Sequence, residues 1–186
     1  MKKVYMPEED SFFLSEVLKN EIKKFKKTNI KKLRFLEIGV GSGIQLETAV
    51  KSGIKKEHIT GVDINNNAVY LCREKGFNVI KSDLFSKIGK NELFNIIIFN
   101  PPYLAESKFD RKKDTSGGKK GNETIINFLK QSKNYLEKNG FILLLTSSFT
   151  PKINLKKLGY KEKVLQTKKL FFEELYVHKL NKFNIK

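Results

Sequence analysis

FNIIIFNPPYL, residues 94–104, is an apolar run that stops abruptly at Asn100. Five of the six residues before Asn100 are apolar and three are consecutive isoleucines, which is typical of a strand buried on both faces of a parallel sheet. Pro101 and Pro102 fix their own φ angles and bias each preceding residue toward an extended conformation. The stretch therefore predicts a buried strand with a stiff exit that holds Asn100 at the edge of the sheet.

The residues from Asn100 to Tyr103 carry groups that together could hold a planar group bearing an NH2. The Asn100 side chain offers a carbonyl acceptor beside an NH2 donor, and Pro101 contributes a backbone carbonyl with no competing N–H. Tyr103 supplies a flat ring. A simple strand stop is the alternative interpretation of the same residues.

Strand and helix patterns alternate along the chain. The predicted elements are, in order, strand 33–38, helix 44–51, strand 58–64, helix 66–75, strand 77–81, the strand that ends at Asn100, helix 123–137, strand 141–148 and a short helix over 153–158. A helix over 11–27 precedes them, with Asp10 or Ser11 as its N-cap. The alternation indicates an α/β fold with a parallel sheet and helices on both faces. The last two β-like runs, 160–168 and 170–179, are too close for a crossover and predict an antiparallel hairpin.

Length and composition favour one globular domain over residues 1–186. Hydrophobic residues make up 39% and charged residues 31%, and no apolar run approaches the ~20 residues of a membrane span. The N-terminus lacks the apolar region of a secretion signal, so we expect a cytoplasmic protein that does not contact membranes. One cysteine, Cys72, excludes an internal disulfide, and His58 and His178 alone predict no metal site.

The net charge of +17 raises the question of nucleic-acid binding. Three of the 37 basic residues are arginine, so the other 34 are lysine, and they are spread along the whole chain. Two interpretations stay open. The lysines form either a solvated surface or a functional basic face for nucleic acid or an acidic partner.

A glycine turn follows the first predicted strand in LEIGVGSG, residues 36–43. Glycines at Gly39 and Gly41 allow a tight turn and close approach of a ligand to the backbone, although such a pattern alone is weak and also suits a packing turn. Glu37 stands just ahead of the turn. We predict that these three residues bind a small molecule at the end of the strand.

Carboxylates follow the next two predicted strands. Asp63 ends the second strand, where a carboxylate can accept both hydroxyls of a ribose. Asp83 ends the third, where it could accept from the NH2 of adenine, with Leu84 beside it to cover the ring. Each aspartate could instead be a helix cap. An adenosine ligand without phosphates fits this set, and S-adenosylmethionine has the adenine, the ribose and an amino-acid end.

The motifs LEIGVGSG, GVDIN, KSDLF and NPPY, in this order, resemble class I S-adenosylmethionine-dependent methyltransferases. VYMPEEDSFFL, NPPYL and DTSGGKKGNE further resemble the HemK-like family, in its short archaeal and eukaryotic branch. That branch methylates the side-chain amide nitrogen (N5) of glutamine in the GGQ motif of class I translation release factors. The resemblance implies a seven-stranded, mostly parallel sheet with the order 3-2-1-4-5-7-6, and residues 1–30 covering the cofactor site.

The resemblance also assigns roles to individual residues. Asn100, Pro101 and Tyr103 would be catalytic, and with Pro102 they would hold the target glutamine. S-adenosylmethionine, which leaves as S-adenosylhomocysteine, would be bound by Ser11, Glu37, Gly39, Gly41, Asp63, Asp83, Leu84 and Asn100. At Ser11 threonine is common in relatives, and the hydroxyl is kept.

The resemblance implies a partner as well. Short-branch enzymes commonly depend on a small zinc-binding activator subunit, and here the predicted strand Phe77–Lys81 would be the sheet edge that pairs with it. The charged segment within residues 101–121 is a candidate substrate-side lid.

Two other functions stay open at this point. A nucleic-acid adenine-N6 methyltransferase could use the same NPPY motif, although the chain has no insertion large enough to flip and read a base. The second alternative is a basic binding module without catalytic activity. The presence of the predicted cofactor-binding carboxylates argues against it.

Overall fold

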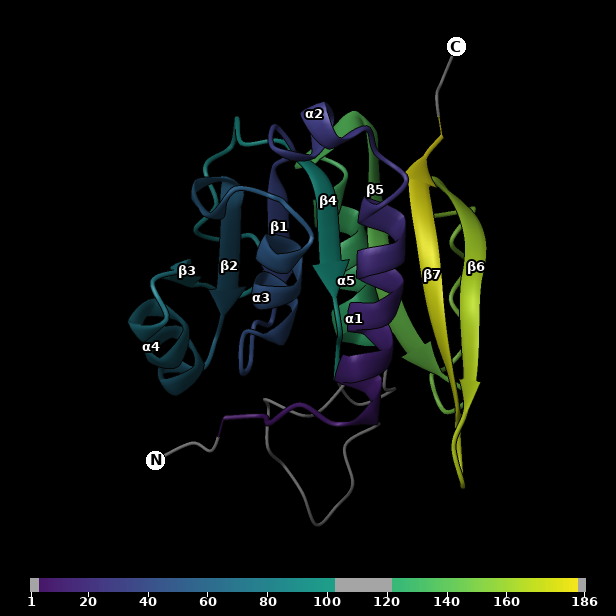
Figure 1. Ribbon diagram of the computed structural model, residues 1–186. Coiled ribbons are helices and arrows are strands. Elements are labelled where there is room, and N and C mark those ends of the chain that lie inside the picture. Colours follow the sequence, from purple (N-terminus) through teal and green to yellow (C-terminus); the bar gives the residue numbers. More distant parts are fainter. Residues whose placement is uncertain (1–3, 103–121, 184–186) are drawn as a thin grey trace.

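The protein, described here by a computed structural model over residues 4–102 and 122–183, is built on one seven-stranded sheet (Figure 1). The strand order is β3-β2-β1-β4-β5-β7-β6. The strands are β1 Phe35–Ile38, β2 Ile59–Asp63, β3 Asn78–Lys81, β4 Phe94–Phe99, β5 Leu136–Ser147, β6 Tyr160–Lys169 and β7 Glu174–Lys182. β1 to β5 pair in parallel, whereas β7 is antiparallel to β5 and β6. This confirms the predicted fold class, its strand order and its C-terminal hairpin.

Helices cover both faces of the sheet. They are α1 Glu9–Ile22, α2 Lys27–Ile30, α3 Ile44–Lys51, the 3-10 helix η1 Lys56–His58, α4 Asn66–Glu74 and α5 Glu123–Ser132. Apolar residues of α1, α3 and α4 pack in one core cluster, and those of α5 pack in a second cluster on the opposite face. None of the helices that the structure describes is long and apolar enough to cross a membrane.

β4 lies in the middle of the sheet and is buried on both faces, as its unbroken apolar sequence predicts. Ile96 and Ile98 join the core cluster under α1, whereas Ile97 and Phe99 join the cluster under α5. β1 and β5 pair with it on either side. Burial from both sides fixes where the strand ends, and so fixes the position of Asn100.

The predicted start and end of the first helix were wrong. Glu8, rather than Asp10 or Ser11, is the N-cap of α1, and both predicted caps are buried in its first turn. The helix ends at Ile22 rather than continuing to residue 27, because the chain turns there and stacks Phe25 on Phe141 with 6.3 Å between ring centroids. α2 is a separate short helix.

Two further boundaries differ from the prediction. α5 ends at Ser132 instead of residue 137, because Leu136 pairs with Phe94 and the Phe94 N–H donates to the Tyr135 carbonyl at 2.8 Å. Residues 155–159 form turns rather than the predicted short helix. The last strand begins at Glu174 because residues 170–173 make the hairpin turn.

The edge at which the parallel strands end, hereafter the carboxyl edge, is where separate parts of the chain meet (Figure 1). The segment before α1, residues 4–8, runs across this edge, and the tip of the β6–β7 hairpin reaches the same level. The opposite edge is hereafter the amino edge. Every site residue predicted from the sequence that the structure describes lies toward the carboxyl edge.

Candidate functional site

The glycine turn after β1 is held by backbone hydrogen bonds to β2 and its flank. The Gly39 N–H donates to the Val62 carbonyl at 2.8 Å, and the Gly41 N–H donates to Asp63 Oδ2 at 2.9 Å. Gly43 has φ +83°, and a Cβ there would lie 2.8 Å from Cys72 Sγ. A side chain at this position would therefore meet both backbone strain and a steric clash.

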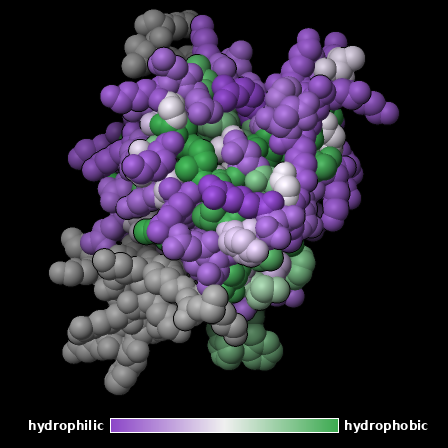
Figure 2. All heavy atoms as spheres, turned by 90° about the vertical axis from the view of Figure 1, so that its left-hand side faces the viewer, coloured by the Kyte–Doolittle hydropathy of each residue, from purple (hydrophilic) through white to green (hydrophobic). Residues whose placement is uncertain are grey.

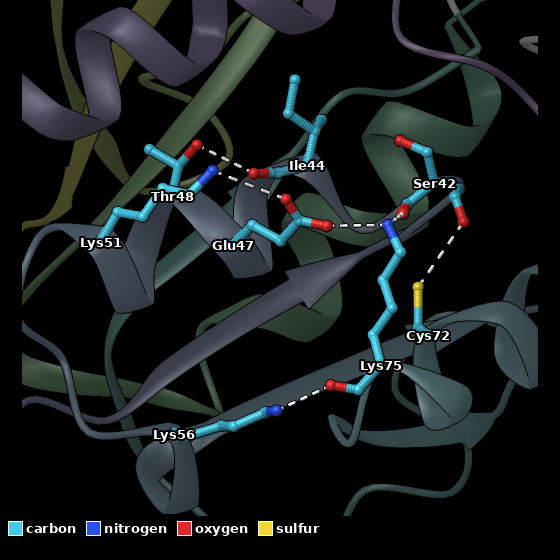
Figure 3. Close-up of polar contacts among 9 residues, drawn as sticks. Ser42, Ile44, Glu47, Thr48, Lys51, Lys56, Cys72 and Lys75 are labelled. Carbon is cyan, nitrogen blue, oxygen red and sulfur yellow. Dashed lines mark hydrogen bonds and ion pairs between the residues drawn. The ribbon is translucent and has the colours of Figure 1, made fainter.

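Side chains from α3 and α4 support the outer side of this turn (Figure 3). Lys75 Nζ donates to Glu47 Oε1 at 2.7 Å and to the Ser42 carbonyl at 2.9 Å. Cys72 lies 3.7 Å from the Gly41 carbonyl, with its pKa raised to about 12, chiefly by burial. Cys72 is therefore a packing residue under the turn, as expected for an unreactive thiol.

Glu37 is buried at the end of β1, with 4% of its surface exposed. Its Oε2 atom has no hydrogen-bond partner among the described residues. Burial, and then the negative charge of Asp63, raise the pKa of this carboxyl well above its ordinary value of 4.5, against a backbone hydrogen bond from Leu46. A buried carboxylate of this kind is a ready acceptor for a cationic or hydrogen-bonding ligand group.

The raised pKa of Glu37 makes the stability of the ligand-free protein depend on pH. Between the ordinary value of 4.5 and the raised folded pKa, the native state holds a proton that the unfolded chain has lost. The free energy of unfolding should therefore fall as pH rises through this window, and Glu37→Gln should flatten the slope. Denaturant unfolding from about pH 5 to about pH 8 measures this. Glu74→Gln, at an exposed glutamate, is the control, and an unchanged slope in Glu37→Gln would contradict the assignment.

Asp63 ends β2 and faces the glycine turn. Its Oδ2 accepts from the Gly41 N–H at 2.9 Å and its Oδ1 from the Asn65 N–H at 2.8 Å. The carboxylate is thereby fixed in orientation and buried. The predicted helix-cap role is thus taken by Asn65, whose side chain caps α4 through the Asn67 N–H at 3.0 Å.

Asp83 follows β3 without belonging to it, in agreement with the predicted strand end at Lys81. β3 stops at Lys81, because the Ser82 N–H turns toward the Asp63 carbonyl at 3.0 Å. Asp83 is exposed, and Leu84 is half-buried with φ +47°, in the left-handed region that side chains disfavour. Leu84 is held there by a hydrogen bond of 2.9 Å from Ser82 Oγ to its carbonyl. Strained backbone of this kind is typical of ligand sites.

Asn100 is oriented by a residue that the sequence analysis did not assign to the site. Its Nδ2 donates to Asp10 Oδ2 at 2.8 Å, and its Oδ1 is buried without a hydrogen-bond partner among the described residues. Pro101 behind it is buried and Pro102 is half-buried. The side-chain carbonyl is thus available to accept, as predicted. Tyr103 and most of the lid candidate lie outside the described residues.

Asp10 collects three donors in the first turn of α1. Besides Asn100, the Tyr5 hydroxyl donates to its Oδ1 at 3.0 Å and the Ser11 N–H at 2.5 Å. Ser11 is buried beside it, and its carbonyl accepts from Gln45 Nε2 at 2.9 Å, which joins α1 to α3. The sequence gives one sign that Asp10 belongs to the site, which is its position directly before Ser11.

The N-terminal segment, residues 4–8, connects the glycine turn with Asp10 and Asn100. The Tyr5 carbonyl is 3.4 Å from where a Cβ of Gly41 would lie, so this segment covers the glycine turn. Tyr5 therefore contacts both the Gly41–Asp63 pair and, through Asp10, the Asn100 side chain. The structure brings together Ser11, Gly41, Asp63 and Asn100. Glu37 lies within β1, between the strands that lead to Asp63 and Asn100, and Leu84 follows the end of β3.

Asp10 should act as a positioning residue for Asn100. In Asp10→Asn the amide can no longer accept from all three donors as a carboxylate does, so Asn100 Oδ1 should lose its fixed direction. We expect kcat to fall about 10-fold while KM and cofactor affinity change less than about twofold. Steady-state kinetics and calorimetry measure this, with exposed Glu16→Gln on the same helix as control. If Asp10→Asn instead lowered the free energy of unfolding and weakened cofactor binding along with kcat, Asp10 would have a structural role.

A hollow of about 650 Å³ opens at the amino edge and is lined in part by Lys152, Tyr160 and Phe183. None of the predicted site residues contributes to it. The polar groups able to hold an adenosine ligand converge instead at the carboxyl edge, the usual ligand position in open α/β sheets.

Comparison with known proteins agrees with this geometry. The family model for the methyltransferase small domain matches residues 13–183. A Methanocaldococcus jannaschii protein, provisionally named protein N5-glutamine methyltransferase, is 41% identical over 94% of this chain and 89% of its own length. The eRF1 methyltransferase catalytic subunit mtq2 of Schizosaccharomyces pombe is 26% identical over 76% of this chain and 71% of its own length.

Among solved structures, the E. cuniculi Mtq2–Trm112 complex, responsible for methylation of the eRF1 translation termination factor, matches with a TM-score of 0.72. It is 23% identical over 96% of this chain and 98% of the matched chain, so it shows a shared fold. These matches confirm the resemblance inferred from the NPPY and glycine-turn motifs. The chain belongs to the methyltransferase small domain family.

Proposed function

We propose that this protein transfers a methyl group from S-adenosylmethionine to the side-chain amide nitrogen of the GGQ glutamine in a class I release factor. The observation that carries the proposal is Asn100, whose NH2 is held by Asp10 while its buried carbonyl oxygen has no hydrogen-bond partner in the part of the chain that the structure describes. A carbonyl fixed in this way is suited to accept from a planar amide. The name of the Methanocaldococcus jannaschii relative supports glutamine as the target, and the name of mtq2 supports a release factor as the substrate.

The residues at the carboxyl edge fit the cofactor. Glu37 Oε2, which has no partner among the described residues, can accept from the ammonium of the cofactor's amino-acid end, and Asp63 can accept from the ribose hydroxyls. Gly39 and Gly41 would contact that end through their backbone. Asp83 and Leu84 would contact the adenine. When bound, S-adenosylmethionine supplies an electrophilic methyl group on a positively charged sulfur. Residues 4–8 and α1 would cover the site.

The chain's own part in the reaction is to hold a weak nucleophile. An amide nitrogen shares its lone pair with its carbonyl, so acceptors for its hydrogens are needed to favour charge on nitrogen. Asn100 Oδ1 and the Pro101 carbonyl would accept these hydrogens, and Tyr103 would pack on the amide plane. Positioning of this kind can contribute up to ~7–11 kcal/mol. Asp10, the carboxylate beside Asn100, already accepts from three donors, so the proton would pass to an acceptor carbonyl or water.

Mass spectrometry of a release factor tests the function. The factor is incubated with the protein and S-adenosylmethionine, and its GGQ peptide is compared with that of an untreated sample. A gain of one methyl group on the glutamine is expected. Label that enters DNA or RNA instead, and is lost on nuclease treatment, would identify the enzyme as a nucleic-acid adenine methyltransferase.

We propose further that a small activator subunit, zinc-binding in the related short-branch enzymes, pairs with the β3 edge, and that the complex acts in the cytoplasm. β3 pairs only with β2 in the described sheet, which leaves its other side unpaired. Half-buried Ile80 lies on this strand, and exposed Ile64 and Tyr70 lie nearby on the β2–α4 unit. Figure 2 shows hydrophobic residues in the middle of this face between hydrophilic ones.

Co-expression tests the partner. With the activator subunit present, soluble yield and methylation should both increase, because pairing covers the open strand and the apolar residues beside it. Size-exclusion chromatography should show a one-to-one complex. Equal solubility and activity without any partner would count against the heterodimer.

A further inference from the structure

The tip of the β6–β7 hairpin carries two almost fully exposed aromatic side chains. Phe171 is 96% exposed and Phe172 is 86% exposed. Their rings contact each other edge to face, with 5.3 Å between centroids and 62° between planes. Such a pair has no role in the core and leaves apolar surface in water, which commonly marks an interaction site.

The tip is held firmly although its two rings are exposed. The Leu170 N–H donates to the Glu173 carbonyl at 2.8 Å, which closes the turn, and the Leu170 side chain packs against the core. Lys168, two residues before Leu170, forms an ion pair with Glu9 in the first turn of α1. The hairpin tip is thus tied to the residue that directly precedes Asp10, which orients Asn100.

Other exposed apolar side chains surround the same edge. Phe149 lies close to the hairpin tip, because the Ser148 N–H donates to the carbonyl of Glu174, the first residue of β7, at 2.8 Å. Phe12 is one turn after Glu9 on α1, and Tyr5 lies over Gly41. Six of the ten large apolar residues that are exposed in the described chain form this apolar rim: Tyr5, Met6, Phe12, Phe149, Phe171 and Phe172. A substrate that reaches Asn100 must stand over the carboxyl edge, and so beside this rim.

Unpartnered polar atoms mark the same edge. Within the described residues, three buried side-chain oxygens lack a hydrogen-bond partner: Glu37 Oε2, Asn100 Oδ1 and Glu173 Oε2. The first two belong to the proposed cofactor and glutamine sites. Glu173 lies at the hairpin tip, next to Phe172. Because an unsatisfied buried acceptor costs free energy, a donor supplied by a bound molecule would stabilise it.

The charge at the rim favours a protein over a nucleic acid. The chain carries +17 overall, yet Glu8 and Glu9 stand at the start of α1, and Glu173 and Glu174 follow the aromatic pair. Lys168 of the hairpin is already paired with Glu9. Local carboxylates repel a phosphate backbone, whereas they suit a protein surface with an apolar patch and flanking donors.

We infer that the apolar rim, with Phe171 and Phe172 at its centre, docks the folded body of the protein substrate beside its glutamine loop. The inference rests on the proposed function. Docking there would place the loop over Asn100 and would distinguish a folded release factor from a free peptide of the same loop sequence.

The test compares the double variant Phe171→Ser/Phe172→Ser with wild type on two substrates, a full-length release factor and a short GGQ peptide. Both residues are exposed, so the thermal midpoint should stay unchanged. Affinity for the factor, measured by fluorescence anisotropy without cofactor, and kcat/KM on the factor should each fall at least about 10-fold, as for loss of an aromatic hot spot. Turnover of the peptide should change less than about twofold. Phe183→Ser, at an exposed phenylalanine on the amino edge, is the matched control. It should change neither the affinity for the factor nor the kcat/KM on either substrate.

The outcomes separate this inference from the proposed function. If wild type methylates both substrates and the double variant loses neither, or loses both equally, the docking role is overturned and the proposed function stands. A variant that loses affinity for an oligonucleotide and keeps its affinity for the factor also overturns it. If wild type methylates neither substrate, the proposed function itself fails and the docking role falls with it.

Discussion

Asn100→Ala should lower kcat on a release factor by about 10²- to 10³-fold, the range found when one preorganised hydrogen-bonding group is removed from a reaction site. The substitution removes the side-chain carbonyl that directly follows β4, and it leaves Asp10 without its donor from Asn100. The target amide would lose both an acceptor and its fixed direction. Rapid-quench assays with saturating cofactor and factor measure the effect on turnover.

Cofactor affinity separates this effect from general damage to the site. In Asn100→Ala the Kd for S-adenosylmethionine should change less than about threefold, because Glu37, Asp63 and the glycine turn are intact. Asn29→Ala, at an exposed asparagine of α2, is the control and should behave as wild type. Full activity of Asn100→Ala would exclude Asn100 from the reaction and would remove the observation on which the proposed function rests.

Asp63→Asn should raise the Kd for S-adenosylmethionine by about 10- to 100-fold, as expected for loss of charged hydrogen bonds to the ribose. The amide places an NH2 where one carboxylate oxygen now accepts, either from the Gly41 N–H at 2.9 Å or from the Asn65 N–H at 2.8 Å. Two donors would then face each other, and the glycine turn would shift. Isothermal titration calorimetry measures the affinity.

The same substitution should also lower the stability of the ligand-free protein, by about 1–3 kcal/mol for a buried group left without its partner. Denaturant unfolding measures this cost separately from the loss of binding. Glu74→Gln, at an exposed carboxylate on α4, should change neither quantity. Unchanged cofactor affinity in Asp63→Asn would assign the aspartate to the turn alone and would move the ribose site elsewhere.

β4 shows what could be predicted from the sequence. A strand buried on both faces needs apolar residues at consecutive positions, and that requirement is visible in FNIIIF without any knowledge of its neighbours. The proline pair then marks where the strand must stop. The sheet could be predicted in the same way, because the spacing of apolar residues changes wherever a strand is followed by a crossover helix.

Contacts between distant segments left no such pattern. Asp10 and Asn100 are 90 residues apart. A carboxylate in the first turn of a helix is also favoured by the helix dipole alone, so its presence does not indicate a site. The end of α5 was missed for the same reason, since pairing of Leu136 with Phe94 overrides local helical preference. The catalytic and binding roles given to the site residues, from Ser11 to Tyr103, all stay predictions.

The N-terminal segment has a consequence for where other proteins can be attached. Residues 4–8 cross the carboxyl edge over Gly41, whereas the chain reaches Phe183 at the amino edge, where its N–H donates to the Gly159 carbonyl at 3.1 Å (Figure 1). A reporter fused before Val4 would stand over the mouth of the site and compete with a large substrate. One fused after Phe183 would point away from it. The two ends of the chain are therefore not equivalent attachment points.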